Sequence, residues 1–203
     1  MEFLGGSSVS LEDLLLIILL VIIGVFAYIL LPMVWGAAYA PSPRAKISVV
    51  LRRVIETYYK HRDVVRIIDL GSGFGRVCFE AVKIDNRVVC HGVDIDPLKI
   101  LWSRIIARIK GIDARTIFTR GNILKIDLEG YDIIYMFLWP EIVLKIEEKI
   151  LKEVRRGCVV ISLEHPLRLL KSEKVDDFYI AFISTRKSKS EEAMHRRSGG
   201  SGI

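Results

Sequence analysis

The stretch RIIDLGSGFGRV places the strongest constraint on what this 203-residue chain can fold into. Its apolar part ends at Asp69, and three glycines follow at alternate positions, Gly71, Gly73 and Gly75. A glycine loop between an apolar strand and a helix lets backbone N–H groups approach a ligand closely, because a Cβ would block that approach. A dinucleotide-binding fingerprint, G-x-G-x-x-G, would need glycine where the chain has Arg76, so this loop differs from that motif.

The alternation of strand and helix continues after this loop. Apolar, β-branched runs predict strands over residues 64–68, 88–93, 114–118, 133–137 and 158–163, and a further, antiparallel strand over 177–185. Helices are predicted over 97–110 and 140–154. The first has Asp96 as its N-cap and an apolar stripe formed by Leu98, Leu101, Trp102, Ile105, Ile106 and Ile109. The pattern predicts an α/β fold with a mainly parallel sheet and helices on both faces.

The N-terminal part contains eighteen consecutive uncharged residues, from Leu14 to Leu31. As a helix they would cover roughly 27 Å, close to the thickness of the hydrocarbon core of a bilayer. We therefore predict one transmembrane helix over residues 14–36. A cleavable signal peptide ending near Ala40 is the alternative, but the acidic N-terminus, the length of the run and Pro41 oppose it.

The charge distribution predicts how this helix is oriented. Glu2, Glu12 and Asp13 precede it without any Lys or Arg, whereas basic residues dominate the segment that follows. The positive-inside rule then places residues 1–13 outside the cytoplasm and the rest of the chain inside, with Trp35 and Tyr39 at the inner boundary. The net charge of +6 is compatible with an anionic membrane surface or with nucleic acid.

The rest of the chain divides by composition. We predict a linker and basic amphipathic helix over residues 41–62, an α/β domain over 63–186, and a polar, Gly/Ser-rich disordered tail over 187–203. The amphipathic helix either covers one end of the sheet or lies against anionic headgroups. Three scattered cysteines (Cys78, Cys90 and Cys158) exclude a disulfide framework, show no metal-binding spacing and are predicted to be small core residues in a reducing compartment.

The acidic residue followed by G-x-G-x-G resembles motif I of class I S-adenosylmethionine-dependent methyltransferases. Three further segments, HGVDIDP, TRGNIL and YDIIYMFLWP, resemble later segments of that family in the same order. The resemblance implies a Rossmann-like class I methyltransferase fold, S-adenosylmethionine as cofactor, and Asp94 as the residue that accepts hydrogen bonds from the ribose hydroxyls. It implies the following cofactor-binding residues: Asp69, Gly71, Ser72, Gly73, Gly75, Asp94, Asn122 and Ile123.

At finer grain the chain resembles the membrane-anchored protein-lysine methyltransferases of the ATP synthase c-subunit and adenine nucleotide translocase type, and their archaeal relatives. The resemblance lies in the apolar segment followed by Pro41–Ser42–Pro43, in DLGSGFGR, in GVDIDP and in VVISLEHP. The chain departs from the family pattern at Phe74, Asp94, Asp96 and Asn122. These changes are compatible with cofactor binding but leave the substrate open.

Lysine methylation needs a neutral amine aligned with the methyl group, and positioning and desolvation supply most of the rate. An aromatic wall and a carboxylate that orients the amine are sufficient, so no dedicated catalytic base is predicted. Phe137, Trp139 and Glu164 lie at the predicted ends of the fourth and fifth strands and are the substrate-side candidates. The expected partner is a protein substrate, a class that includes membrane proteins, and no metal is predicted.

Three alternatives remain open at this point. A methyltransferase of a quinone or another lipid-resident small molecule would suit the same anchor. A nucleic-acid methyltransferase is weaker, because FLWP stands where an N/D-P-P-Y/F motif would follow the fourth strand. A non-catalytic S-adenosylmethionine-binding scaffold would retain the same glycines, since these report binding and not turnover.

Overall fold

The computed structural model describes residues 10–34 and 44–184, with the side chains of the first helix described as far as Ala27. The chain separates into two compact units, with the boundary between Pro41 and Ser42. Several predictions lie outside the described residues. They concern Trp35, Tyr39, the segment 41–43 and the tail over 187–203.

The first unit contains α1 (Leu11–Val34). Its N-terminus is capped by Ser10, whose hydroxyl accepts a hydrogen bond from the Asp13 N–H, while the Ser10 N–H donates to the Asp13 carboxylate at 3.1 Å. The large apolar side chains of α1 are exposed, from 46% at Ile18 to 72% at Leu11. Among the residues that the structure describes, no helix combines the length and the hydropathy that crossing a membrane requires.

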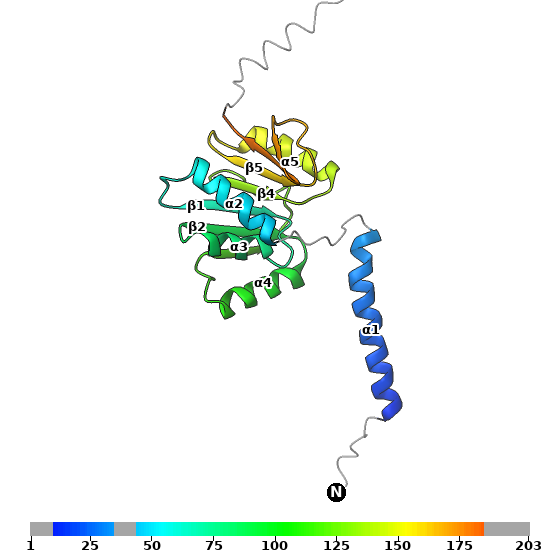
Figure 1. Cartoon of the computed structure of the whole chain (residues 1–203). Helices are drawn as coiled ribbons and strands as arrows, with labels where there is room; N and C mark the ends of the chain where they lie inside the picture. The colour runs from blue at the N-terminus through cyan, green and yellow to red at the C-terminus, as the bar shows by residue number, and fades with distance from the viewer. Residues whose placement is uncertain (1–9, 35–43, 185–203) are drawn as a thin grey trace, which may run out of the picture. The chain divides into compact units, whose positions relative to one another are not determined.

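The second unit is built on a seven-stranded mixed sheet in the order β3-β2-β1-β4-β5-β7-β6 (Figure 1). The first five strands pair in parallel, and β7 pairs antiparallel with both β5 and β6. Their bounds are β1 (Val65–Leu70), β2 (Val88–Asp94), β3 (Thr116–Arg120), β4 (Ile133–Met136), β5 (Val159–Leu163), β6 (Glu173–Val175) and β7 (Phe178–Phe182). The antiparallel strand was predicted, whereas β6 was not.

Helices cover both faces of the sheet, as predicted. α2 (Arg44–Tyr58), α3 (Arg76–Ile84) and α4 (Pro97–Ile109) bury residues in one hydrophobic core, and α5 (Pro140–Glu153) buries residues in the other. Because successive side chains of a strand point to opposite faces, Ile67 belongs to the first core and Ile68 to the second. The predicted α/β Rossmann-like fold is therefore confirmed.

The predicted apolar stripe of α4 is present, but it is not the side of the helix that packs on the domain. Five of the six stripe residues are exposed and Ile106 is partly buried, whereas the buried side chains are Ile100, Ser103 and Ala107 on the opposite side. Two of these are small, which lets the helix lie close to the glycine loop. The Ser103 hydroxyl is 3.3 Å from the carbonyl oxygen of Gly73. The sequence pattern located the stripe, but it gave no information about which side of the helix packs.

The cysteines correct one prediction. Cys78 of α3 and Cys90 of β2 are joined by a disulfide bond, with their Cα atoms 5.2 Å apart, and Cys158 is free and buried. All three cysteines are buried in the core, as expected, but two of them are bonded to each other instead of being free thiols. The odd number and scattered positions of the cysteines gave no indication of this disulfide bond. It joins Cys78 and Cys90 because α3 packs directly against β2.

Tyr59, which directly follows α2, anchors the end of this helix. Its ring is buried and its hydroxyl lies 2.5 Å from the carbonyl oxygen of Asp132 and 2.7 Å from that of Gly157. The neighbouring Tyr58 is exposed and stacks on Phe182.

We predict that Tyr59→Phe lowers the free energy of unfolding by about 1–3 kcal/mol, because it removes the partner of two buried carbonyl groups. Denaturant unfolding followed by circular dichroism measures the change. Tyr58→Phe is the matched control and should unfold like the wild type. Equal effects of the two substitutions would contradict the anchoring role of Tyr59.

Candidate cofactor and substrate site

The strand order reverses between β1 and β4, and ligands of open α/β sheets bind outside the carboxyl ends of the strands at such a point. The glycine loop, residues 71–75, leaves β1 here. The N–H groups of Gly71 and Ser72 both donate to the carbonyl oxygen of Val93, each at 2.9 Å, which fixes the loop against β2.

The glycines of this region serve different purposes. A Cβ on Gly75 would lie 2.7 Å from the Phe118 ring, and one on Gly92 would lie 2.6 Å from it, so these glycines permit close packing. Gly73 has a φ of +53° and nothing within 4 Å of the place a Cβ would take. Its left-handed conformation is one that glycine adopts without strain, and its outer side borders open space.

Asp94, the last residue of β2, is held by two backbone groups. One carboxylate oxygen accepts from the Gly73 N–H at 2.8 Å and the other from the Asp96 N–H at 2.9 Å. Each oxygen can accept a second hydrogen bond. The side chain is therefore fixed beside the open space next to Gly73 and can still bind hydroxyl groups of a ligand.

Two buried polar atoms beside this loop have no hydrogen-bond partner among the described residues. They are one carboxyl oxygen of Asp69 and the hydroxyl oxygen of Ser72. Burial, and to a smaller extent the charge of Asp94, raise the pKa of Asp69 to about 8. Buried polar atoms are rarely left unpaired, so these two fit a ligand that carries polar groups.

Asn122 and Ile123 lie in the loop after β3. The Gly121 N–H donates to the carbonyl oxygen of Asp94 at 2.9 Å, which ties this loop to the end of β2. The side-chain oxygen of Asn122 accepts from the Leu124 N–H at 2.9 Å, and the side chain is exposed. Ile123 is partly buried against the second core. The structure thus brings the predicted cofactor-binding residues to one edge of the sheet.

The substrate-side candidates follow β4 and β5. The Phe137 ring stacks on His165, with centroids 6.4 Å apart, so the ends of the two strands are in contact. Trp139 is the N-cap residue of α5 and is 46% exposed. Glu164 directly precedes His165 in the chain, so the contact of Phe137 with His165 places the segment that contains Glu164 near the end of β4.

Glu164 lies in an acidic group that the sequence analysis missed. Its backbone has a φ of +63°, and its N–H donates to the carbonyl oxygen of Asp177 at 2.7 Å. Lys46 of α2 forms an ion pair with the Asp177 carboxylate. That hydrogen bond, together with the charges of Asp177, Asp176 and Glu164, raises the pKa of Lys46. At this edge the Asp177 carboxylate therefore binds the Lys46 ammonium group, and Asp176 and Glu164 add negative charge nearby.

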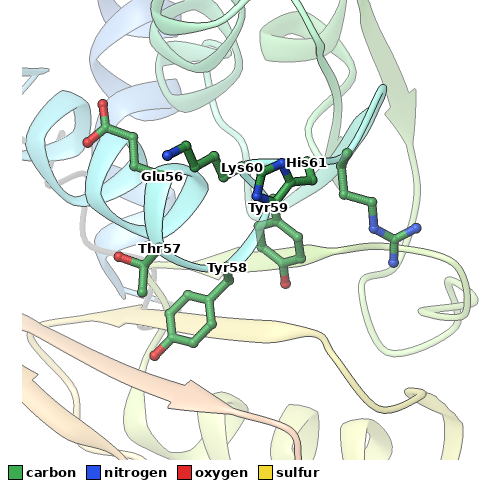
Figure 2. Close-up of a pocket in the computed structure, with 7 residues that line it drawn as sticks. Glu56, Thr57, Tyr58, Tyr59, Lys60 and His61 are labelled. Atoms are coloured by element: carbon green, nitrogen blue, oxygen red, sulfur yellow. The ribbon is translucent and has the colours of Figure 1, made fainter.

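A shallow pocket at the end of α2 lies elsewhere. It is lined by residues 56–62, and Figure 2 shows the Tyr59 ring among them. Because Tyr59 bonds the residues just before β4 and β5, this pocket is at the amino ends of the strands. It is at the opposite edge from the glycine loop and contains none of the candidate residues.

The fold and the loop together define a class I methyltransferase architecture. The structure is similar to the crystal structure of an RNA methyltransferase from Salinibacter ruber in complex with S-adenosyl-L-homocysteine. The TM-score is 0.61 at 20% sequence identity, covering 74% of this chain and 97% of that one. At this identity the likeness concerns the fold alone.

Residues 69–174 match the family described as the ANTKMT methyltransferase domain, and the chain belongs to this family of S-adenosylmethionine-dependent methyltransferases. It is 28% identical over 130 residues to a protein-lysine N-methyltransferase of Saccharolobus islandicus, covering 64% of this chain and 78% of that protein. The mouse adenine nucleotide translocase lysine N-methyltransferase is 28% identical over 102 residues, which cover 50% of this chain.

The human lysine N-methyltransferase of the ATP synthase c-subunit is 27% identical over 100 residues. The chain spans 44% of the mouse protein and 42% of the human protein. The predicted family resemblance is thus confirmed over the α/β domain.

We predict that Asp69→Asn becomes more stable relative to the wild type as the pH rises from about 4 to about 8. The raised pKa means that folded wild-type protein keeps a proton over this range and the unfolded chain does not. The wild type therefore loses about 1.4 kcal/mol per pH unit there. Unfolding at a series of pH values measures the difference. The exposed Asp113→Asn should follow the wild type, and a pH-independent difference for Asp69→Asn would contradict the prediction.

Proposed function

We propose that the chain transfers a methyl group from S-adenosylmethionine to lysine side chains of a protein substrate. The observation that carries the proposal is the Asp94 carboxylate fixed between Gly73 and Asp96 beside open space, in a chain of this methyltransferase family. The relatives named as protein-lysine methyltransferases support the choice of substrate class.

The residues at the loop fit the cofactor. Asp94 would accept hydrogen bonds from the ribose hydroxyls, and the open side of Gly73 would admit the ligand. Asp69 and Ser72 would offer their unpaired polar atoms, and Asn122 and Ile123 would border the adenine. When bound, the cofactor supplies an electrophilic methyl group.

The neighbouring edge would receive the lysine. Phe137 and Trp139 would form an aromatic wall, and Glu164 would orient the amine through a hydrogen bond. The incoming ammonium must first release its proton to water, because only the neutral amine is nucleophilic. The ion pair of Lys46 with Asp177 supports this assignment, since one carboxylate near Glu164 binds an ammonium group in the described structure.

We also propose that residues 14–36 anchor the chain in a membrane, with the methyltransferase domain on the cytoplasmic side. The uncharged run from Leu14 to Leu31 and the basic segment after it support this arrangement. Alkaline extraction of membranes from expressing cells tests the anchor, and protease digestion of intact vesicles tests the orientation. Release of the full chain by alkali would refute the anchor.

Incubation of the purified protein with methyl-labelled S-adenosylmethionine and host membranes tests the reaction. We expect label in protein, recovered as methyl-lysine and absent with Asp94→Ala. Label confined to lipid would instead identify a lipid-resident small molecule as the substrate. Cofactor binding without any label would count against methylation of these proteins and favour a scaffold or a missing partner.

We predict that Gly73→Ala weakens cofactor binding about tenfold or more, because the added Cβ enters the space beside Asp94 and such overpacking costs about 1–3 kcal/mol. Titration calorimetry with S-adenosylhomocysteine measures the affinity. Gly111→Ala is the matched control, since Gly111 also has a positive φ, +64°, and nothing within 4 Å of its Cβ position. A similar loss of affinity in both variants would show that backbone strain, not the ligand space, is responsible.

For the substrate side, we predict that Glu164→Gln raises the KM for the protein substrate several-fold and leaves the affinity for S-adenosylhomocysteine unchanged. The substitution keeps the size of the side chain but removes the charge that attracts an amine. Steady-state kinetics over a range of substrate concentrations measures this. Glu173→Gln, an exposed change on β6, should behave as the wild type. An unchanged KM for Glu164→Gln would remove Glu164 from the site.

A further inference from the structure

The solvent-facing side of α4 carries a continuous apolar surface. We call it the α4 ridge and define it by its exposed side chains and their exposed fractions: Leu98 56%, Leu101 55%, Trp102 53%, Ile105 43% and Ile109 74% on the helix, and Ile95 70% just before its N-cap residue. Single exposed apolar residues are ordinary on a protein surface, but a contiguous row of this size marks an interaction surface. The inward side of the same helix, with Ile100, Ser103 and Ala107, already packs on the domain, so the ridge is not a consequence of a loosely attached helix.

Cationic side chains flank the ridge on both sides. At 3.6 residues per turn, Arg104 and Arg108 fall on one flank, and Lys99 and Lys110 fall on the other. The helix itself contains no acidic residue, and the Asp96 carboxylate at its N-cap position lies 3.6 Å from the Lys99 ammonium group. Arg104 is held in place by hydrogen bonds to the carbonyl oxygen of Phe118, at 2.8 and 2.6 Å, and Lys110 lies over the Phe79 ring.

The combination of an apolar row with cationic flanks indicates the chemistry of whatever binds the α4 ridge. A helix with a Trp- and Leu-containing apolar face between Lys and Arg flanks is typical of helices that lie in the plane of a membrane interface. A second copy of the chain fits poorly, because pairing two ridges would bring the cationic flanks of both copies together. We propose that the α4 ridge inserts into the headgroup region of an anionic lipid bilayer.

Such binding would define where the candidate site acts. α4 begins just after Asp94, so a bilayer held by the ridge would lie near the edge of the sheet that carries the glycine loop. Lysines close to a membrane surface would then be within reach. This last consequence rests on the proposed function, whereas the insertion of the ridge can be tested without any cofactor or turnover.

The test uses the full chain in vesicles made of equal parts phosphatidylcholine and phosphatidylglycerol. An environment-sensitive fluorophore is attached to Leu101→Cys, and a matched variant carries it at Leu151→Cys on α5. Leu151 is of the same residue type and is 46% exposed, but it lies on the other face of the sheet. The native cysteines are disulfide-bonded or buried, and the unsubstituted chain measures any labelling of them.

We expect the probe at position 101 to shift to shorter wavelength with these vesicles, to be quenched by spin-labelled lipid and to be several-fold less accessible to iodide. The probe at position 151 should stay accessible, and Arg108→Glu or pure phosphatidylcholine should reduce the shift at position 101. Equal accessibility at both positions would overturn the proposal. Protection that develops without vesicles, as protein concentration rises or as a soluble partner protein is added, would overturn it in favour of that occupant.

Discussion

The carboxylate of Asp94 connects the three loops on which the candidate site depends. Its oxygens fix the glycine loop through the Gly73 N–H and the start of α4 through the Asp96 N–H, and its own carbonyl oxygen accepts from Gly121 in the loop after β3. One residue therefore sets the relative positions of the segments that leave β1, β2 and β3. Any ligand bound to this edge meets a surface that is already ordered.

This order has an energetic cost. Asp69 is buried with an unpaired oxygen close to the charge of Asp94, and the result is a carboxyl group whose pKa is raised to about 8. Fully paired polar groups would make the domain more stable. Unpaired polar groups at the carboxyl ends of the strands are nevertheless typical of a binding site, because a ligand can complete their hydrogen bonds.

The sequence predicts the framework of the fold well, because glycine positions and runs of apolar residues report local backbone conformation directly. The structure has the five parallel strands close to their predicted bounds. The same holds for the loop after Asp69, for the helix after Asp94 and for the helix after Trp139. The direction in which α4 faces could not be predicted, since helical periodicity shows an apolar arc but not what lies against it. The Cys78–Cys90 bond and the approach of Lys46 to Asp177 depend on contacts between distant segments, and no local pattern encodes them.

The two attachments of α2 have a mechanical consequence. Near its first residues Lys46 pairs with Asp177 at the substrate-side edge, and beyond its last turn Tyr59 is bonded to two carbonyl groups at the opposite edge. A pulling force on the chain ahead of Arg44 would load the ion pairs of Arg44 with Glu80 and of Lys46 with Asp177, while the buried tyrosine holds the far end. Tension at the start of α2 would therefore act on the acidic residues around Glu164 before it acted on Tyr59.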